Sequence, residues 1–307
     1  MAIYKLGRNY FLNVELSDGS ILQVYLPFTI EFNIIRKNLG SVNTCQIRIY
    51  NLSKKNRNLI RYDMSDYSNV RKIQLYAGYG TNLPLIFTGN IIQAWSIREG
   101  VDFITTIESY DGGDGFINGF IPGTATFPSG TTLQNIYKTL MSYMPNTTFG
   151  AIGPSFIYKS GTSTLLVNSR STSYSGDVGD VLRTITGGAF FVDNGKTYIL
   201  SNNECINGNV SIVNYQSGLL NTPLRENSIV TLDIIFEPGI VLGQYIELDT
   251  STFEELNSNS INNNNNVNGF YKITSLTHRG VISESICGDA ISTLEFFAPT
   301  SQLTRVY

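Results

Sequence analysis

Histidine and cysteine are scarce in this chain of 307 residues, which limits the chemistry that it can perform. The only histidine is His278, so a Ser-His-Asp or Cys-His mechanism would have to use it, and no nucleophile lies near it in the sequence. We interpret His278 as a surface or strand-edge residue beside a hairpin turn. The three cysteines, Cys45, Cys205 and Cys287, form no CxxC pair. We therefore expect buried thiols in a reducing compartment rather than a structural zinc site.

Charge and long hydrophobic runs are also limited. Charged residues make up 15% of the chain and hydrophobic residues 42%, which is typical of a folded protein rather than a disordered one. The pI near 5.3 does not indicate a general nucleic-acid-binding surface. No run approaches the ~18 apolar residues that span a bilayer. The N-terminus MAIYKLGRNYF has no apolar h-region, so we expect neither a membrane anchor nor a cleaved signal peptide.

Cofactor motifs are missing as well, and we expect no cofactor and no metal. Neither Gly78-Tyr79-Gly80 nor Gly187-Gly188 belongs to a GxGxxG motif or a P-loop. The stretch YDGGDG, 110–115, resembles a fragment of a calcium loop but lacks the downstream bidentate Glu, so we interpret it as a domain-joining turn. Glu254 and Glu255 are adjacent, and neighbouring side chains on a strand or loop point apart. They make a poor acid/base pair.

What the sequence does contain is β structure. Aromatic residues reach 12%, and most are Tyr and Phe, which favour strands. Apolar and polar residues alternate in the first third of the chain, with turn signals at Asp18-Gly19 and at Gly100. This spacing predicts antiparallel strands within 12–17, 21–26, 30–34, 45–50, 73–77, 86–97 and 103–110. Evenly spaced strands of this kind are typical of a barrel or a sandwich.

One short segment, 51–61, interrupts this series of strands. Ser53 is suited to cap a helix, because its hydroxyl can accept a bond from a free backbone N–H of the first turn. The helix would be polar except for a narrow apolar edge, and its basic residues are Lys54, Lys55, Arg57 and Arg61. A solvated helix face outside the barrel is one interpretation of this cluster. Contact with an acidic surface of a partner or a second subunit is the other.

The middle of the chain has a different pattern. Apolar residues at helical spacing predict one helix that is capped at Thr131 or Thr132 and ends before Pro145, and a second that starts near Asp177. A hairpin over 189–200 turns at Asn194-Gly195. The last third returns to strands, within 229–236, 243–248, 271–277 and 291–297. The Asn-rich segment 257–268 has nothing to bury, so we predict a mobile surface loop.

A weak internal repeat relates the two β-rich parts. One predicted hairpin begins at Gly89 and has Gly100 in its turn. Another begins at Gly269 and has Gly280 in its turn, which is predicted at 278–281, so the two glycines are equally far apart in both. We therefore predict a mainly β protein in which two antiparallel β-barrels flank a smaller α+β module. The predicted domains are 1–111, 112–215 and 216–307.

The order of these motifs resembles the baseplate hub proteins of tailed bacteriophages, the tail-tube-like hub family of contractile injection systems and the related secretion-spike machines. The resemblance covers most of the chain. It rests on loose motifs of Gly, Asn and apolar positions: IEFNIIRKNLGSVNTCQIRIYNLSKKNRNLI, VRKIQLYAGY, IFTGNIIQAWSIREGVDFITTIESYDG, SYSGDVGDVLRTITGGAFFVDNGKTYIL, GLLNTPLRENSIVTLDIIFEPGIVLGQYIEL and GFYKITSLTHRG.

The resemblance implies a structural role and no catalysis. In that family each subunit carries two tail-tube-like barrels, and three subunits form a pseudo-sixfold ring that joins the hexameric tail tube to the trimeric spike. Expected partners are further copies of the chain, the tail tube protein, the spike protein, the tape-measure protein and baseplate wedge proteins, with DNA only in transit. The expected location is the tail baseplate of the virion, after assembly in the cytoplasm of the bacterial host. The basic helix, Ser53 to Arg61, would lie outside the first barrel and help to join neighbours.

Two other functions fit parts of the sequence. A carbohydrate-binding adhesin or accessory baseplate protein is consistent with the Tyr- and Asn-rich β composition, and it would need no ring. A tail-associated cell-wall hydrolase would need clustered carboxylates or a metal site, and the sequence displays neither.

Overall fold

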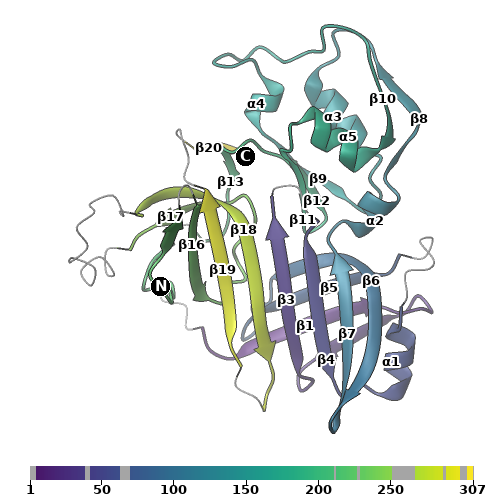
Figure 1. Cartoon of the computed structure of the whole chain (residues 1–307), viewed down its shortest axis with the longest axis vertical. Helices are drawn as coiled ribbons and strands as arrows, with labels where there is room; N and C mark the ends of the chain where they lie inside the picture. Colours follow the sequence, from purple (N-terminus) through teal and green to yellow (C-terminus); the bar gives the residue numbers. More distant parts are fainter. Residues whose placement is uncertain are drawn as a thin grey trace.

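The protein is described here from a computed structural model, which describes residues 5–38, 42–62, 70–210, 212–226, 229–250, 267–285, 288–297 and 303–306. Strands predominate, and the mainly β fold predicted from the sequence is confirmed (Figure 1). Cys287, Glu254 and Glu255 lie outside the described residues, as does most of the Asn-rich segment 257–268.

The first β part contains the strands predicted from the alternating pattern. Its inward-facing residues include Leu12, Val14, Ile47 and Ile49, all buried, because side chains of a strand point alternately to its two faces. Its elements are β1 (Arg8–Glu15), β2 (Ile21–Tyr25), β3 (Ile30–Lys37), β4 (Thr44–Tyr50), α1 (Lys54–Ile60), β5 (Lys72–Tyr79), β6 (Leu85–Glu99) and β7 (Asp102–Tyr110).

The middle module is the predicted α+β unit. Thr132 caps its longest helix by accepting a bond from the N–H of Asn135, and Asp177 caps another in the same way. Its elements are α2 (Gly113–Ile117), β8 (Phe120–Phe127), α3 (Leu133–Met141), β9 (Thr148–Ile152), α4 (Pro154–Ile157), β10 (Thr172–Asp177), α5 (Val178–Ile185), β11 (Phe190–Asp193) and β12 (Lys196–Ile199). The hairpin β11–β12 turns at Asn194-Gly195, as predicted.

The last β part is built mainly from β16, β18 and β19. Its elements are β13 (Glu204–Ile206), β14 (Ile212–Val213), β15 (Leu224–Glu226), β16 (Ile229–Ile235), β17 (Tyr245–Leu248), β18 (Gly269–Ile282), β19 (Ala290–Phe297) and β20 (Thr304–Val306). The predicted turn at 278–281 is wrong, because these four residues lie within β18 and pair with β3. The inward alternation of Leu276, His278 and Ile282 continues the strand past the expected turn.

The two β parts share one sheet. Its strand order is β15-β16-β19-β18-β3-β4-β7-β6-β5-β1-β2, with β14 and β17 paired off this path. The joint is β18: along one edge it pairs first with β17 and then with β3, while β19 pairs with its other edge. Among the described residues the path does not close on itself, so two separate closed barrels do not form; the two β parts are instead two regions of one sheet.

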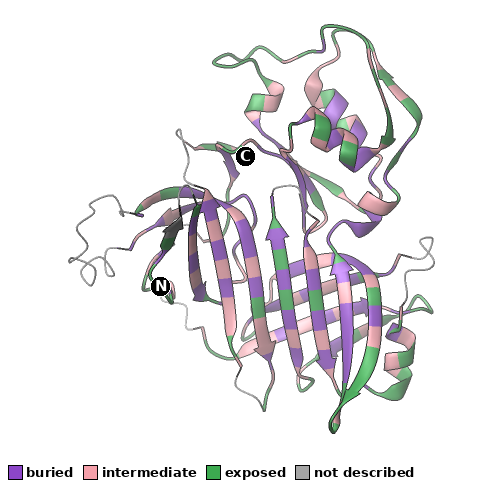
Figure 2. Cartoon of the chain, in the orientation of Figure 1, coloured by how far each residue is buried: buried purple, intermediate pink, exposed green. Residues whose placement is uncertain are grey.

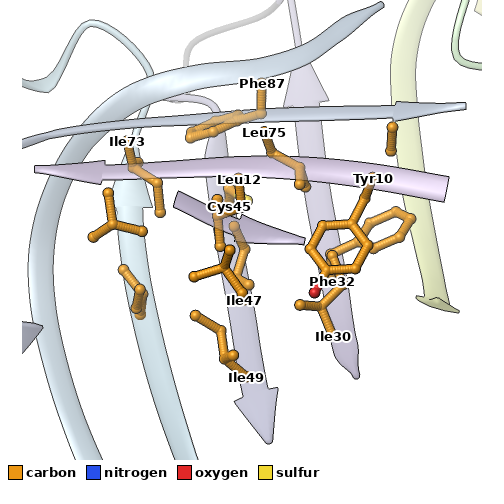
Figure 3. Close-up of a cluster of buried hydrophobic side chains, with 14 of the residues drawn as sticks. Tyr10, Leu12, Ile30, Phe32, Cys45, Ile47, Ile49, Ile73, Leu75 and Phe87 are labelled. Carbon is orange, nitrogen blue, oxygen red and sulfur yellow. The ribbon is translucent and has the colours of Figure 1, made fainter. Parts of the chain in front are cut away.

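The buried residues, purple in Figure 2, include three large apolar cores and a small cluster of Phe191, Leu200 and Leu242. In the first, β1, β5 and β6 run across β3, β4 and β7, so that Leu12, Ile73 and Leu75 face Ile47 and Cys45 (Figure 3). The other two large cores lie in the last β part and in the middle module. The domain boundaries at 111/112 and 215/216 remain a prediction, and β14, just before the second boundary, pairs with β17.

Candidate functional site

The predicted short helix is present as α1, and local contacts fix both the helix and the turn before it. Asn51 has a positive φ of 59°, and its side chain bonds the N–H of Phe103 and the carboxylate of Asp102. These bonds tie the turn to β7. The hydroxyl of Ser53 then accepts a bond from the N–H of Asn56 at 3.3 Å, which confirms the predicted N-cap.

The five predicted contact residues do not behave alike. Lys54, Lys55 and Arg61 are exposed. The guanidinium of Arg57 instead stacks on the Phe103 ring, 3.8 Å from its centroid, and holds the helix against the β6–β7 hairpin. Ser53 serves as the cap. Three side chains are therefore available to a partner, and contact with one remains a prediction.

Sequence reasoning missed Arg71, which completes the C-terminal end of α1. Its buried guanidinium donates to the carbonyl oxygens of Leu59, Ile60 and Arg61 at 3.0 to 3.1 Å. These carbonyls lack partners within the helix, so a cation there satisfies them and opposes the helix dipole. The sequence around Arg71 gives no sign of this role, because the contact forms only in three dimensions.

A broad exposed face extends across the shared sheet. The register aligns Asp233, Thr293, Thr277, Ile35 and Thr44 across neighbouring strands, from the last β part to the first. Figure 2 shows the resulting stripes of buried and exposed residues along these strands. The outward side chains are mostly polar.

Among the cations of this face, Lys37 and Arg279 are exposed, whereas Arg48 is neutralised. Arg48 contacts the carboxylates of Glu31 at 3.0 Å and Glu99 at 3.2 Å. The three side chains are part-exposed, so this network contributes little to stability. Its effect is on the charge that the face presents to solvent.

A cluster of buried polar side chains connects the middle module to the first β part. We call Arg36, Asn43, Asp111 and Asp193 the polar junction. Arg36 pairs with Asp193 at 3.3 Å, and the Asn43 amide bonds both Asp111 and Asp193. The Asp111 carboxylate also accepts bonds from the backbone N–H groups of residues 194 and 195, at 2.6 and 2.8 Å. The turn of the β11–β12 hairpin is thus fixed at the end of β7.

The junction holds two carboxylates and one guanidinium away from water. Burial, and then the charge of Asp193, raises the pKa of Asp111 to about 7, although the backbone bonds and Arg36 oppose the shift. Burial likewise raises the pKa of Asp193, while Arg36 lowers it. Two ionised carboxylates would leave an excess negative charge in the interior, so uptake of one proton by the junction is favoured as the pH falls through this range.

His278 is not a surface residue, and that interpretation is wrong. It lies fully buried on β18, where Nδ1 and the hydroxyl of Ser292 are 2.8 Å apart and its ring meets Phe236 edge-on. The Ser292 hydroxyl also accepts a bond from the N–H of Glu237. Burial, and then the charge of Arg36, lowers the pKa of His278 well below its usual value. Since both residues are fully buried, this His–Ser pair cannot meet a substrate.

The acidic motif at 110–115 is a structural link. Asp114 accepts bonds from the side-chain amides of Asn118 and Asn146, and Asp111 belongs to the polar junction. Amide donors occupy the carboxylate oxygens that a cation would need. No group of three or more potential metal ligands occurs in the described part of the chain.

A second buried contact joins the middle module to the last β part. Lys272 on β18 donates to the carbonyl oxygen of Ser201 at 2.7 Å, and burial lowers its pKa to about 8. Glu204 accepts bonds from the N–H groups of Ser155 and Ser201. The buried thiol of Cys205 lies on the same strand as Glu204, and that of Cys45 lies in the first core. No helix within the described ranges is long and apolar enough to cross a membrane.

The fold is that of tail proteins. It is similar to the 43 kDa tail protein of prophage MuSo2 from Shewanella oneidensis, with a TM-score of 0.56 at 9% identity, over 95% of this chain and 97% of that one. It is also similar to a tail protein from Neisseria meningitidis MC58, with a TM-score of 0.52 at 9% identity, over 94% and 96%. A Francisella PdpA–VgrG complex matches with a TM-score of 0.51 at 7% identity, over 98% of this chain and 60% of that one. No curated protein matches the sequence.

The likeness to these tail proteins is one of fold. The family model described as Baseplate hub gp41 matches residues 12–279. The chain belongs to this family, so it is a structural component of the bacteriophage baseplate and not an enzyme.

Proposed function

We propose that three copies of the chain form a pseudo-sixfold ring that joins the hexameric tail tube to the trimeric spike. The observation that carries this proposal is the shared sheet, because β18 joins two β parts side by side within one chain. Three such chains would place six β parts around an axis. The threefold axis of the ring would match the spike, and its six similar β parts would match the six subunits of the tube.

The ring would enclose a channel along its axis through which DNA passes. The tape-measure protein would end in this channel, and wedge proteins would contact the outside of the ring. Assembly would take place in the host cytoplasm.

Light scattering tests the ring most simply. The purified chain is measured alone and with the spike encoded by the same phage. We expect three 34.0 kDa chains per particle in at least one of the two samples. In the sample with the spike, the mass of the bound spike is added to that of the three chains. A mass of one chain in both samples, with no spike bound, would contradict the proposal, and binding to a glycan array would then be measured.

A further inference from the structure

The two β parts carry opposite net charge. Residues 1–111 contain 12 Lys and Arg and 9 Asp and Glu, a net charge of +3. Residues 216–307 contain 4 basic and 10 acidic residues, a net charge of −6. The residues between them balance, with 5 of each sign. The first β part is therefore basic in net charge and the last is acidic.

Exposed cations of the first β part lie on and just after α1, beside the tip of the β6–β7 hairpin. Lys54, Lys55 and Arg61 are exposed there, and none forms an ion pair with another described residue. Apolar side chains lie beside them: Val101 at the hairpin tip is 86% exposed and Ile97 is 45% exposed. We call these five residues the helix end.

The second surface lies at β15, β16 and the adjacent β19, and in Figure 1 β16 and β19 lie on the opposite side of the molecule from α1. Four apolar side chains are exposed along it, of which Leu224 is the most open at 59%. Asp233 and Glu295 lie on the same face, as the pairing of β16 with β19 requires. Asp233 accepts bonds from Asn221 and Thr293, and within the described residues no cation pairs with it or with Glu295. We call this set, Leu220, Leu224, Ile229, Asp233, Ile235 and Glu295, the strand end.

These two surfaces complement each other but not themselves. A twofold contact would place one end against its own copy and bring like charges together. A head-to-tail contact places cations against carboxylates and apolar side chains against apolar side chains. A second copy of this chain is therefore the occupant that both surfaces fit at once.

We propose that the helix end of one copy docks on the strand end of the next copy. This inference rests on the ring proposed above and specifies its interface. Positive and negative β parts then alternate around the ring, and repeated head-to-tail contacts close after three copies. Opposite charges also speed the encounter of copies at low ionic strength, where screening is weakest.

Charge reversal tests this arrangement in the full chain. One variant carries Lys54→Glu and Lys55→Glu, a second carries Asp233→Lys and Glu295→Lys, and a third carries all four changes. We expect each of the first two to weaken self-association by about tenfold or more at low salt, because like charges then face each other. The third restores the opposite charges with the signs exchanged, so association should recover. Sedimentation velocity, with and without the spike, measures all three.

Two further variants separate the interface from other effects. Lys159→Glu with Arg170→Glu changes the net charge equally at exposed positions of the middle module, and association should stay that of the wild type. Leu224→Lys alters only an exposed side chain of the strand end, so it should fold normally and weaken association. Circular dichroism checks the fold of every variant.

The outcomes distinguish this inference from the ring itself. A wild-type trimer that none of the reversals weakens would overturn the inference and leave the ring standing. A third variant as weak as the first two would also overturn it. A wild-type chain that never trimerises, even with the spike, would refute the ring and the inference together.

Discussion

The first and last β parts contain similar long hairpins but use them differently. The strand β6 has 15 residues and β18 has 14. In the first part, β6 pairs with β7 and with β5, and β5 pairs with β1. These strands enclose a core. In the last part, β18 gives its free edge to β3. The same local pattern therefore builds a closed core in one place and a joint in the other, and the partner available to the strand edge decides which.

The comparison also shows that the two parts depend on each other. Phe236 and Ile282 come from the last part but lie in the core of the first. Tyr79 donates to the carbonyl oxygen of Phe236 at 2.8 Å, and Lys5 pairs with Glu237 at 3.0 Å. A connection of this kind would hold the two β parts at a fixed spacing in the proposed ring.

Phe236→Ala should have the largest effect on this connection. The phenyl ring of Phe236 packs on Phe32, Tyr79 and His278, so its removal leaves a cavity between the two parts. We expect the free energy of unfolding to fall by about 4 kcal/mol, measured by urea titration. Phe120→Ala, at an exposed position of the middle module, is the control and should change little. A loss below about 1 kcal/mol for Phe236→Ala would mean that the two parts are held elsewhere.

Arg36→Ala should be the next in size. It leaves Asp193 buried without its cation, which costs about 3 kcal/mol when a buried pair is broken from one side. Arg48→Ala removes a cation from the exposed face of the same sheet and should cost less than about 1 kcal/mol. Urea titrations of both variants at neutral pH make the comparison. Equal losses of unfolding free energy in the two variants would contradict the account that the buried pair contributes more to stability than the exposed one.

Asp111→Asn should change how stability depends on pH. The pKa of Asp111 is about 7 in the folded chain, against an ordinary value of 3.8, so the folded state binds more protons between these values. Its contribution to stability is complete below about pH 4 and is lost as the pH rises through 7. The wild type should therefore lose stability relative to Asp111→Asn from pH 4 to pH 7. Parallel curves of unfolding free energy for the two proteins would show that Asp111 does not titrate there.

Ser53→Ala should have the smallest of these effects. Loss of the cap bond to Asn56 should reduce stability by about 1 kcal/mol. Because α1 lies in the first part only, hydrogen exchange should speed up there and not in β16 or β19. Ser160→Ala, in an exposed loop, is the matched control. Faster exchange throughout the chain would indicate a global effect instead.

The sequence predicted what depends on neighbouring residues. Alternation located most strands, and the capping side chains of Ser53, Thr132 and Asp177 located three helix starts. The sequence did not reveal the joint at β18 or the polar junction, since both bring together residues far apart in the chain. His278 could have been placed correctly, because Leu276, His278 and Ile282 share one face of an alternating strand. For Arg71 no comparable signal exists.

Electron cryomicroscopy of the chain bound to its spike tests the central claim most directly. The account predicts three copies in a closed ring, with six β parts around the axis and the helix end of each copy against the strand end of the next. A single copy on the spike would contradict this account. So would a ring in which the first β parts of neighbouring copies touch each other.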